Sequence, residues 1–372
     1  MSVKSRTPHL RKEHIMKKRI ISVVMAAMLA ASVTACGGSS SSAPATTAAA
    51  ATEAAASEAA APAEAASHDA IALTFATGGA DTLPSYAAAI DVVSDIEAAD
   101  PAIDINYMGA RQLGDDAEIL QQVMGGTVQI GGVGYSVFST YCPYLEAIAL
   151  PFVLNDYDKE KTALQTPEAQ ALFDKVEEEL GVKVLASYDS GMRHLANNTR
   201  PINSLEDMKG LKLRVVPSDL LVNSFTALGC NPANVPYGDI YTSLQNKVID
   251  GEEINVTSIN SEKHYEVLKY FTEIGIYPFA TIIFANADWF NSLPADVQAT
   301  IQDAFVKGYD YNFDKYIAEA EEAGYKAMED SGMEISVIED KSAFQEAVAP
   351  YIEDYKEKDP AIKAFVEMAE GL

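Results

Sequence analysis

The chain has 372 residues, 48% of them apolar. Since a single core rarely exceeds about 250–300 residues, this length predicts a signal segment followed by a two-domain body. The formal net charge is -27, and it is about -33 after the first 36 residues, which carry seven Lys or Arg and only Glu13 as an acid. A surface this acidic repels phosphates and anionic head groups, which excludes nucleic acid as an expected partner.

An export signal is the first predicted element. Residues 16–19, Met-Lys-Lys-Arg, form a basic n-region, and residues 20–33 form an apolar segment too short to span a bilayer core, which needs roughly 20 residues. The sequence Val-Thr-Ala before Cys36 resembles the lipobox of bacterial lipoproteins, which implies that Cys36 is lipidated. A simple secretory signal, with Cys36 incidental, is the alternative. We expect residues 1–35 to be a signal peptide that starts at Met16, and the mature chain to be lipid-anchored on the extracytoplasmic face of the cell membrane.

A tether over residues 36–68 is the next predicted segment. After the lipidated cysteine it consists of Gly, Ser, Ala, Thr, Pro and Glu, without an aromatic residue until His68. Such a composition cannot bury enough apolar surface to offset the entropy lost on ordering. We expect a disordered segment that holds the globular part off the membrane.

From residue 69 short apolar strands alternate with helices, which predicts an α/β fold with largely parallel sheets. A helix over 84–99 places Ile90, Val93 and Ile96 on one face, and a second helix begins at Asp115 and ends at Gly125. The expected strands cover residues 71–75, 103–107, 128–133, 182–188, 211–216 and 277–284.

The longest predicted element is a helix over residues 295–331. This segment contains no proline, and its apolar residues recur at helical spacing. A helix of about 35 residues would be roughly 50 Å long, which exceeds one small domain, so we expect it to run along both domains. Two ordinary helices broken near Gly308 or Gly324 are the alternative.

Reactive groups for an enzyme are scarce. From residue 69 on there are two histidines, His194 and His264, and no HExxH, CxxC, GxSxG or phosphate-binding GK[ST] motif. Cys142 and Cys230 have no metal-type spacing, and two buried thiols are favoured over a disulfide. We expect no enzyme activity, no metal and no cofactor.

Several separated motifs follow one another in a characteristic order. They are QLGDD at 112–116, ALPF at 149–152, GLKLRV at 210–215, ALGCNP at 227–232, VIDGEE at 248–253 and YEVLKY at 265–270. The series resembles the solute-binding proteins of TRAP transporters, the tripartite ATP-independent periplasmic family, over about residues 70–330. The resemblance implies a receptor that closes two domains on a small organic acid and delivers the acid to TRAP-type membrane permease subunits.

The resemblance also implies the residues of the site. Arg214 matches the family arginine that clamps a ligand carboxylate, and a guanidinium suits this role because it offers two parallel hydrogen bonds. Arg193 matches a second family arginine, for which a structural ion pair is the alternative, and Tyr237 matches a bulky residue that packs on the ligand. Glu253 and Asn255 complete the expected substrate-binding set.

Two departures from the family pattern bear on the ligand. Family members often carry asparagine directly after the VDGxE motif, whereas Ile254 stands there in this chain and Asn255 comes one position later. Sialic-acid-binding members carry an acidic and a basic residue where Gly134 and Val137 align, so sialic acid is disfavoured. A dicarboxylate, a keto or hydroxy acid, a sugar acid or an aromatic acid all fit the pattern.

The resemblance implies an α/β, two-domain periplasmic-binding-protein-like (Venus flytrap) fold with a long domain-spanning helix. Domain I is expected to comprise residues 69–190 plus 279–319, and domain II residues 191–278 plus 320–372. A receptor for an ATP-driven importer is the nearest alternative, and the motif series and the long helix argue against it. A lipoprotein enzyme is disfavoured by the missing nucleophile–histidine pairs, and an adhesin by the absence of repeats.

Overall fold

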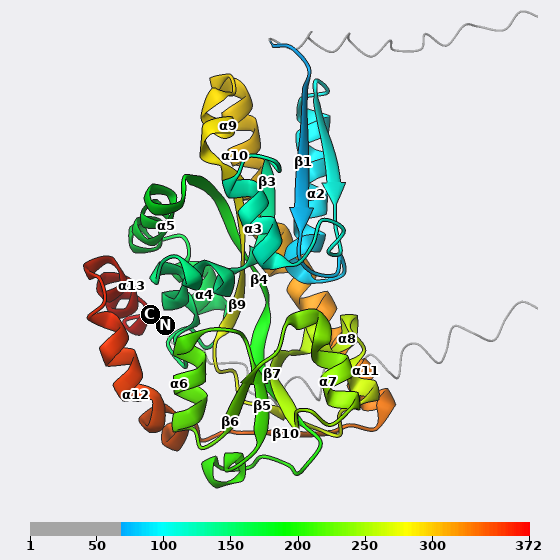
Figure 1. The fold of residues 1–372 in the computed structure, drawn as a ribbon, viewed down its shortest axis with the longest axis vertical. Coiled ribbons are helices and arrows are strands. Elements are labelled where there is room, and N and C mark those ends of the chain that lie inside the picture. Colours follow the sequence, from blue (N-terminus) through cyan, green and yellow to red (C-terminus); the bar gives the residue numbers. More distant parts are fainter. Residues whose placement is uncertain (1–67) are drawn as a thin grey trace, which may run out of the picture. The chain divides into compact units, whose positions relative to one another are not determined.

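The computed structural model describes residues 68–372, which form a two-domain α/β fold (Figure 1). The expected signal peptide, Cys36 and nearly all of the tether lie outside the described residues. The strands are β1 (Ile71–Thr77), β2 (Ile103–Met108), β3 (Ile130–Gly134), β4 (Val182–Asn197), β5 (Lys212–Val215), β6 (Asn231–Asn234), β7 (Gly251–Asn255), β8 (Tyr270–Glu273), β9 (Pro278–Asn286) and β10 (Glu334–Val337).

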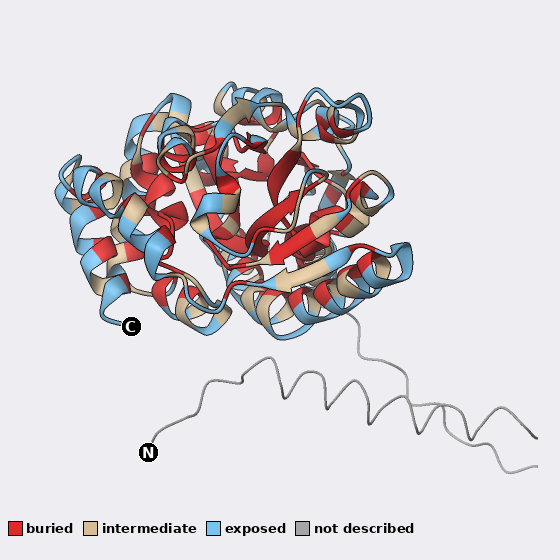
Figure 2. Ribbon diagram, turned by 90° about the horizontal axis from the view of Figure 1, so that it is seen from below, coloured by how far each residue is buried: buried red, intermediate tan, exposed pale blue. Residues whose placement is uncertain are grey.

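Helices cover both parts of the ten-stranded sheet, with their outer faces exposed and most of the strands between them buried (Figure 2). The α-helices are α2 (Pro84–Ala99), α3 (Asp116–Met124), α4 (Tyr157–Ala163), α5 (Pro167–Leu180), α6 (Asp219–Ala227), α7 (Ile240–Gln245), α8 (Val256–Ser261), α9 (Ala287–Ser292), α10 (Ala295–Asp310), α11 (Ile317–Ser331), α12 (Ser342–Lys356) and α13 (Pro360–Glu370). Short 3-10 turns are η1 (Tyr135–Thr140), η2 (Tyr144–Ala149), η3 (Leu205–Met208), η4 (Tyr237–Asp239) and η5 (His264–Glu266).

Local sequence accounts for the first two helices. Pro84 stands at the start of α2, where its missing N–H costs nothing, and Val92 and Ile96 point into the core. Asp115 caps α3 by accepting from the Glu118 N–H, while the Glu118 carboxylate accepts from the Asp115 N–H, which is a complete capping box. Both predicted helices are therefore confirmed.

The two domains share strand β4. In the first domain the strand order is β2-β1-β3-β9-β4, and in the second it is β4-β7-β5-β6, with β8 also paired to β4. Residues 182–192 of β4 pair with β9, and residues 193–197 pair with β7, both in antiparallel orientation. The expectation of largely parallel sheets is therefore wrong at the centre of the sheet, where β4 pairs antiparallel with both β9 and β7.

The long helix runs along both domains without a break. Helices α10 and α11 are joined by a π-helical turn over Tyr311–Tyr316 whose flanking residues keep right-handed helical angles. Helix α10 packs on α2 of the first domain, and α11 packs on α8 of the second. A Cβ on Gly308 would overlap the Tyr188 hydroxyl, and one on Gly324 would overlap Val256, so these glycines permit close packing and do not end the helix.

The π-helical turn binds the point where β4 passes from one domain to the other. Buried Asn312 accepts from the Asp189 N–H (2.7 Å) and donates to the Asp189 carbonyl (2.8 Å). The pairing of β4 with β9 is irregular between Asp189 and Met192, and Gly191 has a φ of 126°. A side chain on Gly191 would be strained and would lie 3.1 Å from the Asn255 Cβ. Strand β4 crosses between the domains at this point, which borders the site described below.

The two cysteines of the body are separate buried thiols. Cys142 and Cys230 are both free, as the favoured interpretation of the sequence required. Burial raises the pKa of Cys142 to about 11 and that of Cys230 to about 12, so both thiols stay protonated at neutral pH. Over residues 68–372, no helix has the length and apolar character needed to cross a membrane.

The C-terminal helices contact both domains. Helix α12 packs on α6 of the second domain, whereas α13 packs on α5 and η2 of the first. The Tyr355 hydroxyl of α12 donates to the buried Glu146 carboxylate (2.6 Å), which also accepts from Ser218 at the start of α6. The exact chain boundaries of the two domains stay a prediction.

Candidate ligand site

A cavity of about 520 Å³ lies where the two domains meet. This volume falls within the range usual for small-molecule sites, roughly 300–1,000 Å³. The first domain contributes Arg111 and Asp116, and the second contributes Arg214 and Tyr237. Arg193, on the shared strand β4, completes the charged part of this wall.

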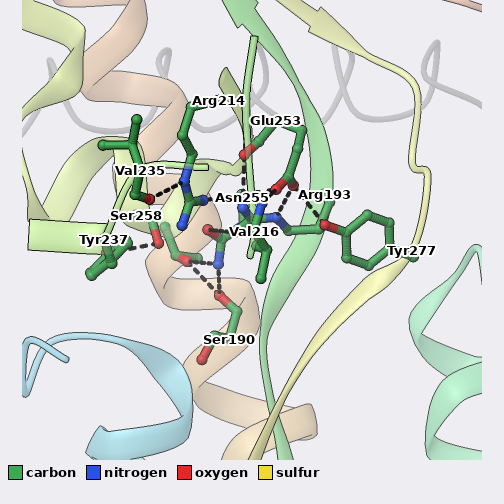
Figure 3. A network of polar contacts seen from close by, with 11 residues as sticks. Ser190, Arg193, Arg214, Val216, Val235, Tyr237, Glu253, Asn255, Ser258 and Tyr277 are labelled. Carbon is green, nitrogen blue, oxygen red and sulfur yellow. Dashed lines mark hydrogen bonds and ion pairs between the residues drawn. The ribbon is translucent and has the colours of Figure 1, made fainter. Parts of the chain in front are cut away.

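Arg193 is fully engaged by protein groups (Figure 3). Its Nε donates to Glu253 Oε2 (2.6 Å), Nη2 to the Glu253 carbonyl (2.7 Å) and Nη1 to Asn255 Oδ1 (3.1 Å). The guanidinium also lies 4.9 Å from the centre of the Phe279 ring. Burial alone would lower the pKa of Arg193, but the Glu253 carboxylate together with Tyr277 and Tyr135 holds this pKa above its ordinary value. Arg193 is therefore a permanently charged member of a buried ion pair.

Arg214 is equally buried but much less engaged. Its Nε donates to the Val235 carbonyl (3.1 Å), and Nη1 approaches Glu253 Oε1 at 3.8 Å without a hydrogen bond. Among residues 68–372, Nη1 has no hydrogen-bond partner. Burial lowers the pKa of Arg214, and the Glu253 carboxylate offsets only part of that effect. The side chain thus presents an unsatisfied cationic donor at the cavity wall.

The other predicted site residues divide into two groups. Tyr237 lines the cavity, and its hydroxyl donates to Ser258 (3.0 Å). Glu253 and Asn255 are fully buried behind Arg193 and are absent from the cavity wall. Asn255 donates to the Ser190 carbonyl (2.5 Å), so it ties β7 to the crossing point of β4. These two residues support the arginines and do not face the cavity.

Four charged wall residues were missed by the sequence analysis: Arg111, Asp115, Asp116 and Asp239. Asp116 belongs to the QLGDD motif, and its Oδ2 accepts from the Gly134 N–H (2.9 Å). Burial raises the pKa of Asp116 to about 6, although the hydrogen bond from Gly134 opposes that rise. Arg111 immediately precedes the motif and carries no periodic signal of its own. Its position one residue before a recognised motif was the available clue.

Within the described part of the chain, no group of three or more His, Cys, Asp or Glu side chains is arranged to hold a metal ion. The two histidines of the body serve the protein itself. His264 Nδ1 lies 2.8 Å from the buried Glu252 carboxylate, and His194 Nδ1 accepts from the Ile274 and Gly275 N–H groups. The polar side chains of the cavity wall carry guanidinium, carboxyl, amide and hydroxyl groups.

Comparisons with known proteins agree on one family. Residues 76–359 match the family described as bacterial extracellular solute-binding protein, family 7. A solute-binding protein of Chromohalobacter salexigens is 29% identical over 256 residues, which cover 68% of this chain and 75% of the relative. The ectoine/5-hydroxyectoine-binding periplasmic protein of Ruegeria pomeroyi is 30% identical over 245 residues, which cover 64% of this chain and 71% of the relative.

Solved structures show the same fold. A TRAP periplasmic solute-binding protein from Sulfitobacter sp. NAS-14.1, with bound β-D-galacturonate, has a TM-score of 0.75 and 26% identity, covering 81% of this chain and 100% of that one. A TRAP protein from Roseobacter denitrificans, with bound β-D-glucuronate, has a TM-score of 0.76 and 26% identity, covering 80% and 99%. The two-domain Venus flytrap fold expected from the sequence is thereby confirmed. The chain belongs to family 7 of the bacterial extracellular solute-binding proteins, which are the receptors of TRAP transporters.

Proposed function

We propose that Arg214 holds the carboxylate of a small organic acid in the cavity between the two domains. The observation that carries this proposal is the buried guanidinium at the cavity wall, whose Nη1 has no hydrogen-bond partner among residues 68–372. An unsatisfied buried cation is costly, and a carboxylate is the group that best matches its geometry. Glu253 supports Arg193 on the same wall from behind, and Tyr237 contributes an aromatic face.

The chain is an extracytoplasmic solute receptor for a TRAP-type transporter, and its ligand is a small organic acid. We infer that it captures and releases its ligand without chemical conversion. Solved relatives hold galacturonate or glucuronate, and a related Vibrio cholerae protein is a C4-dicarboxylate-binding protein. These acids are the first candidates for the ligand of this chain.

We expect ligand capture to depend on closure of the two domains, which share strand β4. The cavity wall is split between the domains, so an acid contacts both parts of the wall only when the domains are closed. Such a ligand shifts the population towards the closed form, and the hinge near Asp189 and Gly191 takes up the motion. The membrane subunits then recognise the closed, loaded receptor.

The function is tested by identifying the ligand directly. Mass spectrometry of the purified protein should detect a co-purified organic acid. A thermal-shift screen of uronic, aldonic, hydroxy, keto and dicarboxylic acids should then raise the melting temperature for a narrow subset, because ligands that bind only the folded state stabilise it. Binding only of uncharged solutes, or of none of these compounds, would contradict the proposed function.

We also propose that Cys36 anchors the mature receptor to the membrane through lipid. The support is the lipobox-like sequence at 33–36, which follows an apolar segment of signal length. Replacing Cys36 with Ala should release the protein from the membrane fraction or block its maturation, as followed by cell fractionation and intact mass. A mutant that fractionates and matures as the wild type does would refute the anchor. Such a result would leave the ligand site untouched.

A further inference from the structure

Arg111 reaches across the cavity from one domain to the other. Its backbone belongs to the first domain, where its N–H donates to the Thr77 carbonyl (3.1 Å). Its side chain contacts the second domain, where Nη2 donates to both oxygens of the Glu262 carboxylate (3.1 and 3.4 Å). The guanidinium also lies 5.4 Å from the centre of the Tyr237 ring. Arg111 is thus a direct contact between the domains at the cavity wall.

A buried nitrogen of the Arg111 guanidinium, Nη1, has no hydrogen-bond partner among residues 68–372. The backbone of Arg111 has a φ of 64°, a conformation that residues with side chains rarely adopt. Such local strain is found where the surrounding structure fixes a side chain for a task. Because an unpaired buried donor is costly, an acceptor on the ligand would complete Arg111.

An unused acceptor lies on the same wall. Asp116 uses Oδ2 to accept from the Gly134 N–H, while its Oδ1 is buried without a partner among residues 68–372. Burial raises the pKa of Asp116, and the nearby Arg111 charge acts in the opposite direction. A free donor together with a free acceptor suits a hydroxyl group, because a hydroxyl both donates and accepts.

The ion pairs around the cavity leave one arginine for a ligand carboxylate. Glu253 neutralises Arg193 and Glu262 neutralises Arg111, each by a hydrogen-bonded ion pair. Arg214 is the cavity arginine without a hydrogen-bonded carboxylate. The other charged residues of the wall are acids: Asp115, Asp116 and Asp239. A second ligand carboxylate would therefore be buried without a cation of its own, which disfavours its binding.

We propose that Arg111 is a specificity-determining residue that, with Asp116, binds a hydroxyl group of the ligand, so that the ligand is a hydroxylated monocarboxylate. This inference rests on the carboxylate role proposed for Arg214. Glu262 is a positioning residue: it holds the Arg111 side chain across the cavity and cancels its charge. Arg214 attracts the carboxylate, and the Arg111–Glu262 pair selects against a second negative charge at the other end.

The test uses two probes that differ at one end only. D-gluconate and D-glucarate share an open six-carbon chain, but the former ends in a hydroxymethyl group where the latter has a second carboxylate. Calorimetric titration of the wild type should show gluconate binding at least about tenfold more tightly. Glu262→Gln leaves the Arg111 charge uncompensated, so the preference should shift by about tenfold or more towards glucarate.

Two further variants isolate Arg111. Arg111→Gly removes the side chain while favouring the observed φ, and should weaken gluconate binding by about 10-fold to 100-fold, the usual effect of losing a hydrogen bond from a charged group. Glu206→Gln makes the same chemical change as Glu262→Gln in an exposed pair with Lys209 (2.7 Å), away from the cavity. This control should leave both affinities unchanged.

The outcomes separate this inference from the proposed function. Equal or tighter wild-type binding of glucarate, or an unchanged preference in Glu262→Gln, would overturn the role of Arg111 and Glu262. If neither probe binds while a dicarboxylate or a carboxylate without hydroxyl groups binds in an Arg214-dependent manner, the hydroxylated-monocarboxylate class is wrong and the proposed function stands. If no carboxylate binds, both fail. Because Glu262→Gln retains Arg111, the test does not depend on the folding of the glycine variant.

Discussion

Replacing Arg214 with Ala should weaken ligand binding by roughly 30-fold to several thousand-fold. Removing one partner of a buried, hydrogen-bonded charge pair typically costs about 2–5 kcal/mol, and about 1.4 kcal/mol corresponds to a factor of ten in affinity. Arg214→Lys keeps the charge but loses the planar fork, so it should also bind the acid poorly. The measurement is calorimetric titration with the acid identified by mass spectrometry.

The same substitution should spare the ligand-free fold. Within the described part of the chain, the Arg214 side chain donates one hydrogen bond, to the Val235 carbonyl, and burial already disfavours its charge. The ligand-free melting temperature of Arg214→Ala should therefore stay within a few degrees of wild type, which is the shift expected from about 1 kcal/mol. Arg200→Lys is a suitable control, because Arg200 lies outside the cavity and donates to the backbone carbonyls of Asp207 and Lys209. Unchanged affinity in Arg214→Ala would remove this residue from the site, and a collapsed fold would instead favour a structural role.

Elements with a strong local signal could be predicted from the sequence. The bounds of α2 follow from Pro84 and an apolar face, and α3 follows from the Asp115–Glu118 capping box. The extent of β4 could not be predicted, because Asp189, Ser190 and Gly191 resemble a loop in sequence. In the structure this polar stretch is buried, and the Asn312 side chain satisfies its backbone from far along the chain. Long-range partners of this kind leave no trace in local periodicity.

The candidate site also depends on long-range contacts that the local sequence does not indicate. Arg214 was identified through the GLKLRV motif, whereas the pairing of Arg111 with Glu262 joins residues 151 positions apart and no motif announces it. Glu253 and Asn255 alternate along β7 and so share one face of the strand. The sequence indicates this shared face, but only the pairing of β7 with β4 places Arg193 between these residues and the cavity.

Removing Arg193 should destabilise the protein itself. The Glu253 carboxylate accepts from Arg193, from the Val216 N–H (2.7 Å) and from the Tyr277 hydroxyl (2.8 Å). Arg193→Met keeps most of the side-chain volume but leaves this buried carboxylate without its hydrogen-bonded cation. Breaking a buried ion pair in this way costs about 3–5 kcal/mol, which corresponds to a fall of roughly 5–15 °C in the ligand-free melting temperature.

A double-mutant cycle assigns this cost to the pair. Glu253→Gln should also destabilise, because it leaves the Arg193 charge buried without its carboxylate. The double variant with Arg193→Met and Glu253→Gln buries neither charge of this pair, so its loss of stability should be smaller than the sum of the two single losses by about 1–3 kcal/mol. Additive losses, or an unchanged melting temperature in Arg193→Met, would refute the ion pair as the support of the wall. Arg214 and Arg193 are then distinguished by measurement, since Arg214 should govern ligand affinity while Arg193 should govern the stability of strand β4.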